Sequence, residues 1–245
     1  MRHVRSDAFV LATYPLREKD RIVSLLTRET GKMRGVARGA RGPRSGFAGA
    51  LEPMTEIRVL AFEKEGRELV TINSAEIVRS SFPLSNDLDR ALLLSAFAES
   101  LMTFVSESEP AASFYRLARH VMDALFMGAP PGPTAAYFDV WVLQLSGLFP
   151  STGECAGCGR PISASEPLLF DEVRPGFVGG ECRGAEVLRL SSGARRELAS
   201  ILSSPLDPAW RPDRIAEIAA VARRARRHFL GHELKSQRVL AGVLE

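Results

Sequence analysis

The chain has 245 residues, of which 45% are hydrophobic and 25% charged, a composition typical of a folded globular protein. The formal net charge is only +3, but residues 1–80 hold 15 Lys and Arg against 10 Asp and Glu, so positive charge is concentrated toward the N-terminus. No apolar run approaches the roughly 20 residues of a membrane-spanning helix, and the charged first residues do not resemble a secretion signal. We therefore expect a cytoplasmic protein without a membrane partner.

Short runs of apolar and β-branched residues dominate residues 7–79 and predict β-structure. Five strands are expected, at residues 8–12, in 22–27, in a basic segment after Gly31, in 57–62 and in 68–72. So many short strands in so few residues favour a small Greek-key barrel in residues 1–80, with the OB-fold as the natural candidate and an SH3-like barrel as the alternative.

Residues 30–45, the basic stretch, are the most informative part of the sequence. This stretch contains no acidic residue between its first and last cation, and its five cations are Lys32, Arg34, Arg38, Arg41 and Arg44. Arginine without a local partner is rarely buried, so we expect a strand that runs into an exposed, glycine-rich loop. Such a loop suits the phosphate backbone of a nucleic acid, although a solvated loop that binds nothing has the same composition.

The pattern changes to helical near residue 83 and predicts a second domain at residues 81–245. Helices are expected at residues 88–105, 111–126, 134–148, 191–203 and 213–230, followed by a basic tail. Residues 128–133 contain three prolines and two glycines and predict a break between the second and third helices. Residues 151–190 lack a clear period and are expected to form an irregular insertion.

All three cysteines lie in this insertion, where Cys155 and Cys158 form a Cys-x-x-Cys knuckle and Cys182 follows after two glycines. The spacing favours a structural Zn²⁺ site, but Ala185 stands where a second Cys-x-x-Cys pair would supply the fourth ligand. Three alternatives stay open: a zinc site completed by another ligand, a knuckle that has lost its metal, and a redox-active cysteine pair. The candidates for a fourth ligand are water, Asp171, Glu181, His228 and His232.

A second group of cations lies near the C-terminus, where weaker candidates for contact with DNA or a partner protein are Arg223, Arg227, Lys235 and Arg238. Cations at the end of a helix also interact favourably with the helix dipole, which is the structural alternative. No phosphate-binding loop, dinucleotide fingerprint, nucleophile elbow or metalloprotease motif occurs, so we expect no catalytic residues and no enzyme activity.

Several segments, in their order and spacing, resemble the RecO family of bacterial DNA-repair proteins. They are Tyr14 to Thr27, Gly31-Lys32, Val36 to Arg41, Phe138 to Leu148 running into Pro150 and the Cys155/Cys158 knuckle, and Lys235-Ser236-Gln237-Arg238. The resemblance covers nearly the full length. The sequence departs from the zinc-bearing members of that family in lacking the fourth cysteine.

The resemblance implies a multi-domain α+β fold, with an N-terminal five-stranded OB-fold barrel and an α-helical domain that carries a zinc-finger-like insertion. It also implies a non-enzymatic mediator of DNA repair and homologous recombination in the RecF pathway. Such proteins bind single- and double-stranded DNA, anneal complementary strands and help to load RecA, and the five cations of the basic stretch would form the DNA-binding face. The implied partners are RecR, RecF and the acidic tail of single-strand-binding protein, at the nucleoid.

Two other classes of function compete with this hypothesis. OB barrels with cationic loops serve RNA equally well, so an RNA-binding or ribosome-associated module is the first alternative. A metal- or thiol-dependent enzyme that uses Cys155, Cys158 and Cys182 is the second. Preference for structured RNA over single-stranded DNA, with no annealing activity, would favour the former. Retention of function after all three cysteines are replaced by serine, in protein that stays folded, would eliminate the latter.

Overall fold

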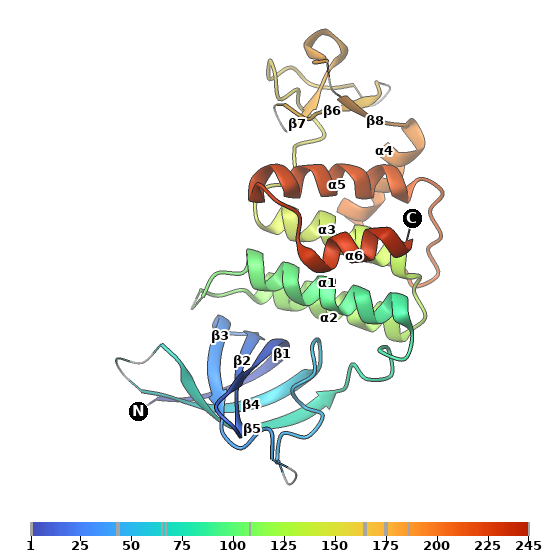
Figure 1. The fold of residues 1–245 in the computed structure, drawn as a ribbon. Coiled ribbons are helices and arrows are strands. Elements are labelled where there is room, and N and C mark those ends of the chain that lie inside the picture. The colour runs from blue at the N-terminus through green and yellow to red at the C-terminus, as the bar shows by residue number, and fades with distance from the viewer. Residues whose placement is uncertain are drawn as a thin grey trace. The chain divides into compact units, whose positions relative to one another are not determined.

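The computed structural model describes residues 2–42, 45–64, 66, 68–107, 109–163, 166–173, 176–185 and 187–244 (Figure 1). The chain divides into two compact units, one formed by Met1–Arg119 together with Leu234–Glu245 and the other by His120–Glu233. The domain boundary expected between residues 80 and 81 lies where the strands end and the helices begin. That two domains meet there stays a prediction.

The first unit begins with a closed barrel of five strands (Figure 1). The strands are β1 (Arg2–Leu16), β2 (Asp20–Thr27), β3 (Gly31–Ala37), β4 (Glu56–Glu63) and β5 (Val70–Arg79). Their order around the barrel is β1-β2-β3-β5-β4; β3 and β5 are parallel, and the other pairs are antiparallel. This is the five-stranded OB-fold predicted for residues 1–80, and β1 is longer than the sequence indicated because it pairs with both β2 and β4.

The barrel interior is filled by every second residue of each strand, as the two-residue period of a β-strand requires. Its fully buried members include Ala8, Val10, Val23, Leu25, Ala37, Ile57, Val59 and Ala61. Gly35 also faces inward, because a Cβ at this position would lie only 2.7 Å from Cγ2 of Val70 and from Cγ1 of Ile72. The glycine therefore allows β3 and β5 to approach closely where the barrel closes.

Helical segments complete the first unit. Helix α1 (Leu88–Phe104) begins at Asp87, whose carboxylate accepts a hydrogen bond from the Arg90 amide. The predicted basic tail is instead a helix, α6 (Lys235–Leu244), which packs along α1. Glu99 of α1 fixes the start of α6 by accepting hydrogen bonds from the amides of Lys235 at 3.1 Å and Ser236 at 2.8 Å.

A buried carboxylate links the first turns of helix α2 (Ala112–Phe126), which belong to the first unit, to the barrel. Glu56 of β4 is 3% exposed and accepts a hydrogen bond of 2.7 Å from the Tyr115 hydroxyl. The guanidinium of Arg79 lies 3.7 Å from the same carboxylate and offsets its charge. Burial, together with the hydrogen bond to Glu56, raises the pKa of Tyr115 far above its usual value.

The second unit is built on helices α3 (Pro131–Leu145), α4 (Ser192–Ser203) and α5 (Ile215–Leu230). Helix α3 starts three residues before the predicted Thr134, because Pro131 occupies the first helical turn, where a missing amide hydrogen costs nothing. A buried ion pair of 2.8 Å joins Arg226 of α5 to Asp139 of α3. Within the described residues, no helix combines the length and apolar character needed to cross a membrane.

The insertion at residues 151–190 is more regular than predicted. Strands β6 (Leu168–Asp171), β7 (Gly176–Val178) and β8 (Val187–Leu190) form an antiparallel sheet in the order β7-β6-β8, and a short 3₁₀ helix spans Gly180–Cys182. The edge-to-face packing of Phe170 and Phe177 helps to form its core. The prediction of irregular structure was wrong because strands of three or four residues are too short to show a period.

Candidate nucleic-acid interface and cysteine cluster

Two turns of the barrel are tied together at one of its ends. The β1–β2 turn, residues 17–19, contacts the turn that follows β3, residues 38–42. The Gly39 amide donates to Oδ1 of Asp20 at 2.9 Å, and the Arg41 amide donates to the carbonyl of Lys19 at 3.0 Å. The Arg41 guanidinium adds a bond of 3.3 Å to the carbonyl of Arg17. The antiparallel pairing of β2 with β3 places these turns side by side, because Arg21 at the start of β2 lies opposite Ala37 at the end of β3.

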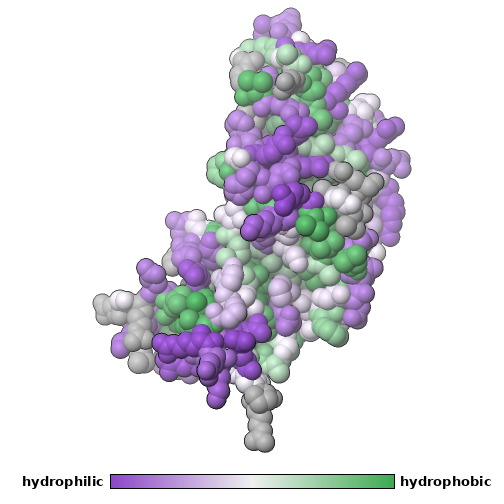
Figure 2. Space-filling model, in the orientation of Figure 1, coloured by the Kyte–Doolittle hydropathy of each residue, from purple (hydrophilic) through white to green (hydrophobic). Residues whose placement is uncertain are grey.

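This arrangement gathers four exposed cations, Arg17, Lys19, Arg38 and Arg41. Strand β3 adds the exposed Arg34, three residues before the strand ends. We call these five residues the cationic barrel end. Among the described residues, no side chain pairs with the guanidinium groups of Arg34 and Arg38, so both remain available to an external anion. Figure 2 shows a group of hydrophilic residues over part of the barrel surface, next to a hydrophobic patch. The guanidinium geometry suits bidentate contact with phosphate oxygens.

Arg17 adopts a backbone conformation that is unfavourable for its residue type. Its φ of 54° lies in the left-handed region, where among the described non-glycine residues only Met54 is also found. Such a conformation costs about 1 kcal/mol for a residue with a Cβ. Glycine would relieve this strain, which makes Arg17 a candidate functional residue at this turn.

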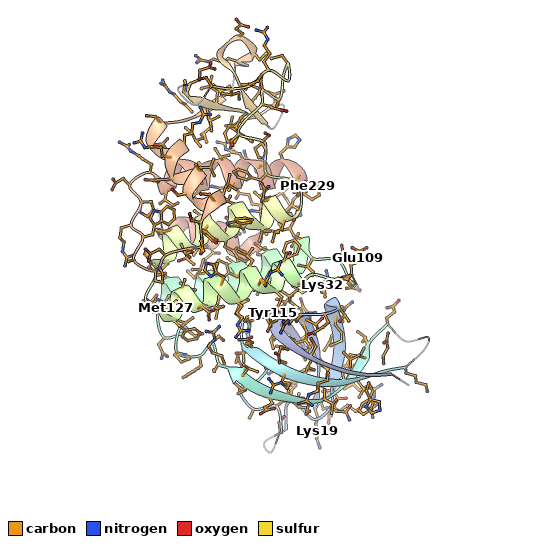
Figure 3. All side chains as sticks on the ribbon, turned by 180° about the vertical axis from the view of Figure 1, so that it is seen from behind. Lys19, Lys32, Glu109, Tyr115, Met127 and Phe229 are labelled. Carbon is orange, nitrogen blue, oxygen red and sulfur yellow. The ribbon has the colours of Figure 1, made fainter. Side chains whose placement is uncertain are left out.

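Lys32 has a different environment from the other predicted cations. Its side chain is partly buried, and its Nζ donates a 2.9 Å hydrogen bond to the Met102 carbonyl, near the C-terminal end of α1. Figure 3 shows Lys32 on the helix-facing side of the barrel and Lys19 at the opposite end. The preceding Gly31 has a φ of 73°, and a Cβ there would lie 1.9 Å from the Glu109 carbonyl oxygen. Lys32 therefore anchors β3 to the helical segment of the same unit.

The remaining predicted cations do not form one group. Arg44 lies outside the described residues. Arg223 and Arg227 belong to α5 in the second unit, where Arg223 is partly buried and Arg227 is exposed, whereas Lys235 and Arg238 are exposed on α6 in the first unit. The structure thus brings two cations of the basic stretch, Arg38 and Arg41, to the joined turns, and Arg34 is exposed on β3.

Sequence reasoning missed Arg17 and Lys19 as site residues. Both lie in a segment that contributes to the family resemblance, but their role depends on the pairing of β2 with β3. A β-hairpin over residues 20–37 places the start of β2 next to the end of β3. Recognising this hairpin in the sequence could have identified Arg17 and Lys19 as neighbours of the basic stretch.

The three cysteines converge in the second unit. Their Sγ atoms all lie within 4.8 Å of one another, which fits the three occupied corners of a tetrahedral thiolate site. Gly157 gives the knuckle its close approach, because a Cβ there would lie 3.0 Å from Cβ and 3.3 Å from Sγ of Cys182. The predicted clustering of Cys155, Cys158 and Cys182 is confirmed.

The thiols differ in their tendency to ionise. A backbone hydrogen bond of 3.4 Å from the Gly179 amide is the main cause that lowers the pKa of the Cys155 thiol, to about 6. Hydrogen bonding to Cys158 is the main cause that raises the pKa of Cys182, to about 11. A thiolate at Cys155 is the form that binds a soft cation.

A fourth ligand does not join the cluster among the described residues. Ala185 offers no donor atom, and the ligand atoms of Asp171, Glu181, His228 and His232 do not lie within the 4.8 Å group. Glu181 is instead paired with Arg160 at 3.0 Å. The cluster therefore provides three protein ligands that could hold a metal ion.

The closed β1-β2-β3-β5-β4 barrel, with exposed cations beside its β1–β2 turn, places the chain among the OB-fold proteins. Barrels of this class commonly bind oligonucleotides or oligosaccharides on the face of strands 2 and 3 and the adjoining turns. The cationic barrel end occupies this location, and its charge favours a polyanion.

Comparisons of this chain with known protein families and proteins agree on one family. Recombination protein O N terminal matches residues 1–81, and Recombination protein O C terminal matches residues 85–238. The DNA repair protein RecO of Koribacter versatilis is 37% identical over 174 residues, which cover 71% of this chain and 70% of that protein. The DNA repair protein RecO of Anaeromyxobacter sp. (strain K) is 33% identical over 254 residues, with 98% and 96% covered. The chain therefore belongs to the recombination protein O family of DNA repair proteins.

Proposed function

We propose that this protein is a recombination mediator that binds single- and double-stranded DNA through the cationic barrel end and anneals complementary strands. Hydrogen bonds join the β1–β2 turn to the turn after β3 and so bring exposed cations together at one end of the barrel. This observation carries the proposal. Arg34, Arg38 and Arg41 are the proposed DNA-binding residues from the basic stretch, and Arg17 and Lys19 are added to them. Arg44 continues the same run in the sequence.

Annealing follows from the electrostatics of such a surface. Arginine and lysine side chains contact phosphates without regard to sequence, so the same surface can bind either strand. Two strands held on one protein are close together, and the cations screen their mutual repulsion. Base pairing then supplies the specificity, and the protein needs no catalytic group.

The proposed pathway role includes protein partners. We propose that the protein acts with RecR in the RecF pathway, at the cytoplasmic nucleoid, and helps RecA to load on strands coated by single-strand-binding protein. The acidic tail of that protein would require cations, for which Arg223, Arg227, Lys235 and Arg238 are the candidates.

We propose a structural role for the cysteine cluster. Cys155, Cys158 and Cys182 would hold a Zn²⁺ ion through three thiolates, and water would complete the tetrahedron that Ala185 leaves open. Such an ion would link the Cys155–Cys158 knuckle to the 3₁₀ segment that precedes β8.

The annealing of complementary oligonucleotides tests the proposed function. Wild-type protein is expected to accelerate annealing at low salt, and a variant with Arg34, Arg38 and Arg41 replaced by alanine is expected to lose most of this acceleration. All three side chains are exposed, and the backbone bond from the Arg41 amide to Lys19 remains after the Arg41 side chain and its bond to Arg17 are lost. The variant should therefore keep the circular dichroism spectrum of the wild type and lose little melting temperature.

The control replaces Arg116, Arg196 and Arg211 with alanine, which removes the same charge from exposed positions elsewhere. An equal loss of annealing in both variants would show that net charge alone, and not the position of the cations, causes the effect. Tight binding of structured RNA, with no annealing of DNA strands by the wild type, would instead favour the RNA-binding alternative.

A further inference from the structure

A pocket of about 370 Å³ opens on the barrel beside the cationic barrel end. It lies where the β1–β2 turn, the end of β3 and the start of β5 meet, within the first unit. The described residues that line it are Leu16, Arg17, Asp20, Val36, Arg38, Glu68, Leu69, Val70 and Thr71.

Barrel closure produces this pocket. The parallel pairing of β3 with β5 sets Gly35 opposite Val70 and Val36 opposite Thr71. Because Gly35 lacks a side chain, the two strands approach closely, and the Val70 side chain packs inside the barrel. Val36, on the outer face of β3 opposite Thr71, gives the pocket apolar surface. The β1–β2 turn forms another side of the pocket through Arg17, whose backbone is in the left-handed region.

The lining combines three kinds of chemistry in one small space. Leu16, Val36 and Leu69 offer apolar surface for the face of a flat ring. Arg17 and Arg38 offer guanidinium groups, which stack on bases or donate hydrogen bonds. Asp20 and Glu68 offer carboxylate oxygens, and one oxygen of Asp20 is already bonded to the Gly39 amide. A phosphate alone would use the guanidinium groups but would be repelled by the carboxylates.

We propose that this pocket binds one unpaired base of a DNA strand whose phosphates lie on the cationic barrel end, and that it prefers guanine. This inference rests on the proposed function. Guanine presents O6 and N7 acceptors to an arginine and carries two neighbouring N–H donors, at N1 and N2, that match a carboxylate. In thymine, two carbonyl oxygens flank a single N–H donor, so a carboxylate is repelled on both sides.

Glu68 is the specificity-determining residue in this arrangement, because its exposed carboxylate has no partner among the described residues. Phosphate contacts supply affinity for any strand, whereas Glu68 distinguishes the base that enters the pocket. The pocket would thereby hold one nucleotide of a strand in register while its neighbours remain free to pair.

Fluorescence anisotropy with short oligonucleotides tests this inference. The probes are oligothymidylate of about 12 nucleotides, a length within the site size of an OB fold, and the same strand with one central dG or with deoxyinosine, which lacks the 2-amino group. Wild-type protein is expected to bind the dG strand about tenfold more tightly than oligothymidylate, with the inosine strand between them. Glu68→Gln should abolish this preference while keeping or raising the affinity for oligothymidylate, because it removes a negative charge.

The matched control is Arg34→Ala, an exposed cation of β3 that does not line the pocket. It should weaken binding of all three strands by the same factor. If the wild type binds all strands without a preference for dG, the proposed base-binding role of the pocket is wrong, and the proposed function is unaffected. A dG preference that persists in Glu68→Gln would also contradict the role of the pocket. If the wild type binds none of the strands, the proposed function is wrong as well.

Discussion

At the scale of single residues, the same charge has different roles because the backbone places it differently. Lys32 and Arg34 are two residues apart on β3 and point to the same outer face. The Lys32 ammonium group is bonded to the Met102 carbonyl, whereas Arg34 is exposed. Both were predicted to bind DNA; Lys32 has a structural contact, and Arg34 stays a proposed DNA-binding residue.

The first prediction separates these two roles. Lys32→Met should lower the free energy of unfolding by about 1 kcal/mol, because it removes a charge-assisted hydrogen bond near the end of a helix, and should leave the salt dependence of DNA binding nearly unchanged. Arg34→Met, the matched control, should show the reverse pattern. Urea unfolding and anisotropy titrations measure the two quantities, and a large loss of DNA affinity in folded Lys32→Met would contradict the assignment.

The second prediction concerns the left-handed conformation of Arg17. Glycine adopts a φ of 54° without the steric cost that arginine incurs. Arg17→Gly should therefore leave the melting temperature unchanged or slightly raised, although DNA affinity falls. Lys19→Gly is the control: Lys19 has no positive φ, so this variant should lose both stability and affinity. A lower melting temperature for Arg17→Gly than for Lys19→Gly would refute the argument.

At the scale of elements, the sequence predicted the strands of the barrel and five of the helices because each has a clear period or a recognisable cap. Asp87 before α1 and Ser191 before α4 are examples of such caps. The sheet of the insertion escaped prediction because β7 has only three residues and all four residues of β6 are buried, so neither shows alternation. Helix α6 was missed because its packing partner, α1, lies far away in the sequence.

The candidate interface was predictable only in part for a related reason. A run of cations is visible in the sequence, and it identified Arg34, Arg38 and Arg41. The contribution of Arg17 and Lys19 depends on hydrogen bonds between two turns, and that of Lys32 depends on the position of a helix end. These are tertiary contacts, which composition and spacing do not encode.

The third prediction concerns Glu99, which caps α6. Partial burial opposes its ionisation, but hydrogen bonds from Ser236 and Lys235 prevail and hold the pKa of Glu99 below its usual value. A carboxylate with a lowered pKa stabilises the folded state at neutral pH, and this contribution is lost as the pH falls through that pKa. Glu99→Gln should destabilise α6 by about 1 kcal/mol at pH 7 and by less at an acidic pH at which Glu99 is protonated in the folded protein.

Hydrogen exchange of the α6 amides, compared between wild type and variant at both pH values, measures this effect. Glu107→Gln is a suitable control, because Glu107 is exposed and lies outside the helices. The same destabilisation at both pH values would show that the charge of Glu99 has no part in the capping.

The fourth prediction concerns the cysteine cluster. Purified wild-type protein should contain about one zinc ion per chain by mass spectrometry of the metal, because three thiolates and water can complete a tetrahedral site. Cys155→Ser should lose the metal. Ala185→Cys should supply the missing fourth thiolate and raise the resistance to a chelator at least tenfold. A chain that contains no zinc as wild type and none as Ala185→Cys would identify the cluster as a knuckle without a metal.

At the scale of the whole molecule, the charge distribution fits the family to which the chain belongs. A net charge of +3 is too small to attract DNA uniformly, but the excess of cations in residues 1–80 concentrates positive potential on the barrel. The second unit keeps its own core and its own cysteine cluster, with the ion pair of Arg226 and Asp139 buried between α5 and α3. Sequence-independent binding to phosphates is the property that a protein needs if it must act on any broken DNA.

The measurement that tests this account most directly is the salt dependence of single-stranded DNA binding, for wild type and for a variant with Arg17, Lys19, Arg38 and Arg41 replaced by alanine. Each lost phosphate contact should flatten the slope of the logarithm of affinity against the logarithm of salt concentration by about 0.7. The account predicts a weaker and clearly flatter dependence in the folded variant. An unchanged affinity and slope would contradict it, because the DNA would then bind elsewhere than at the cationic barrel end.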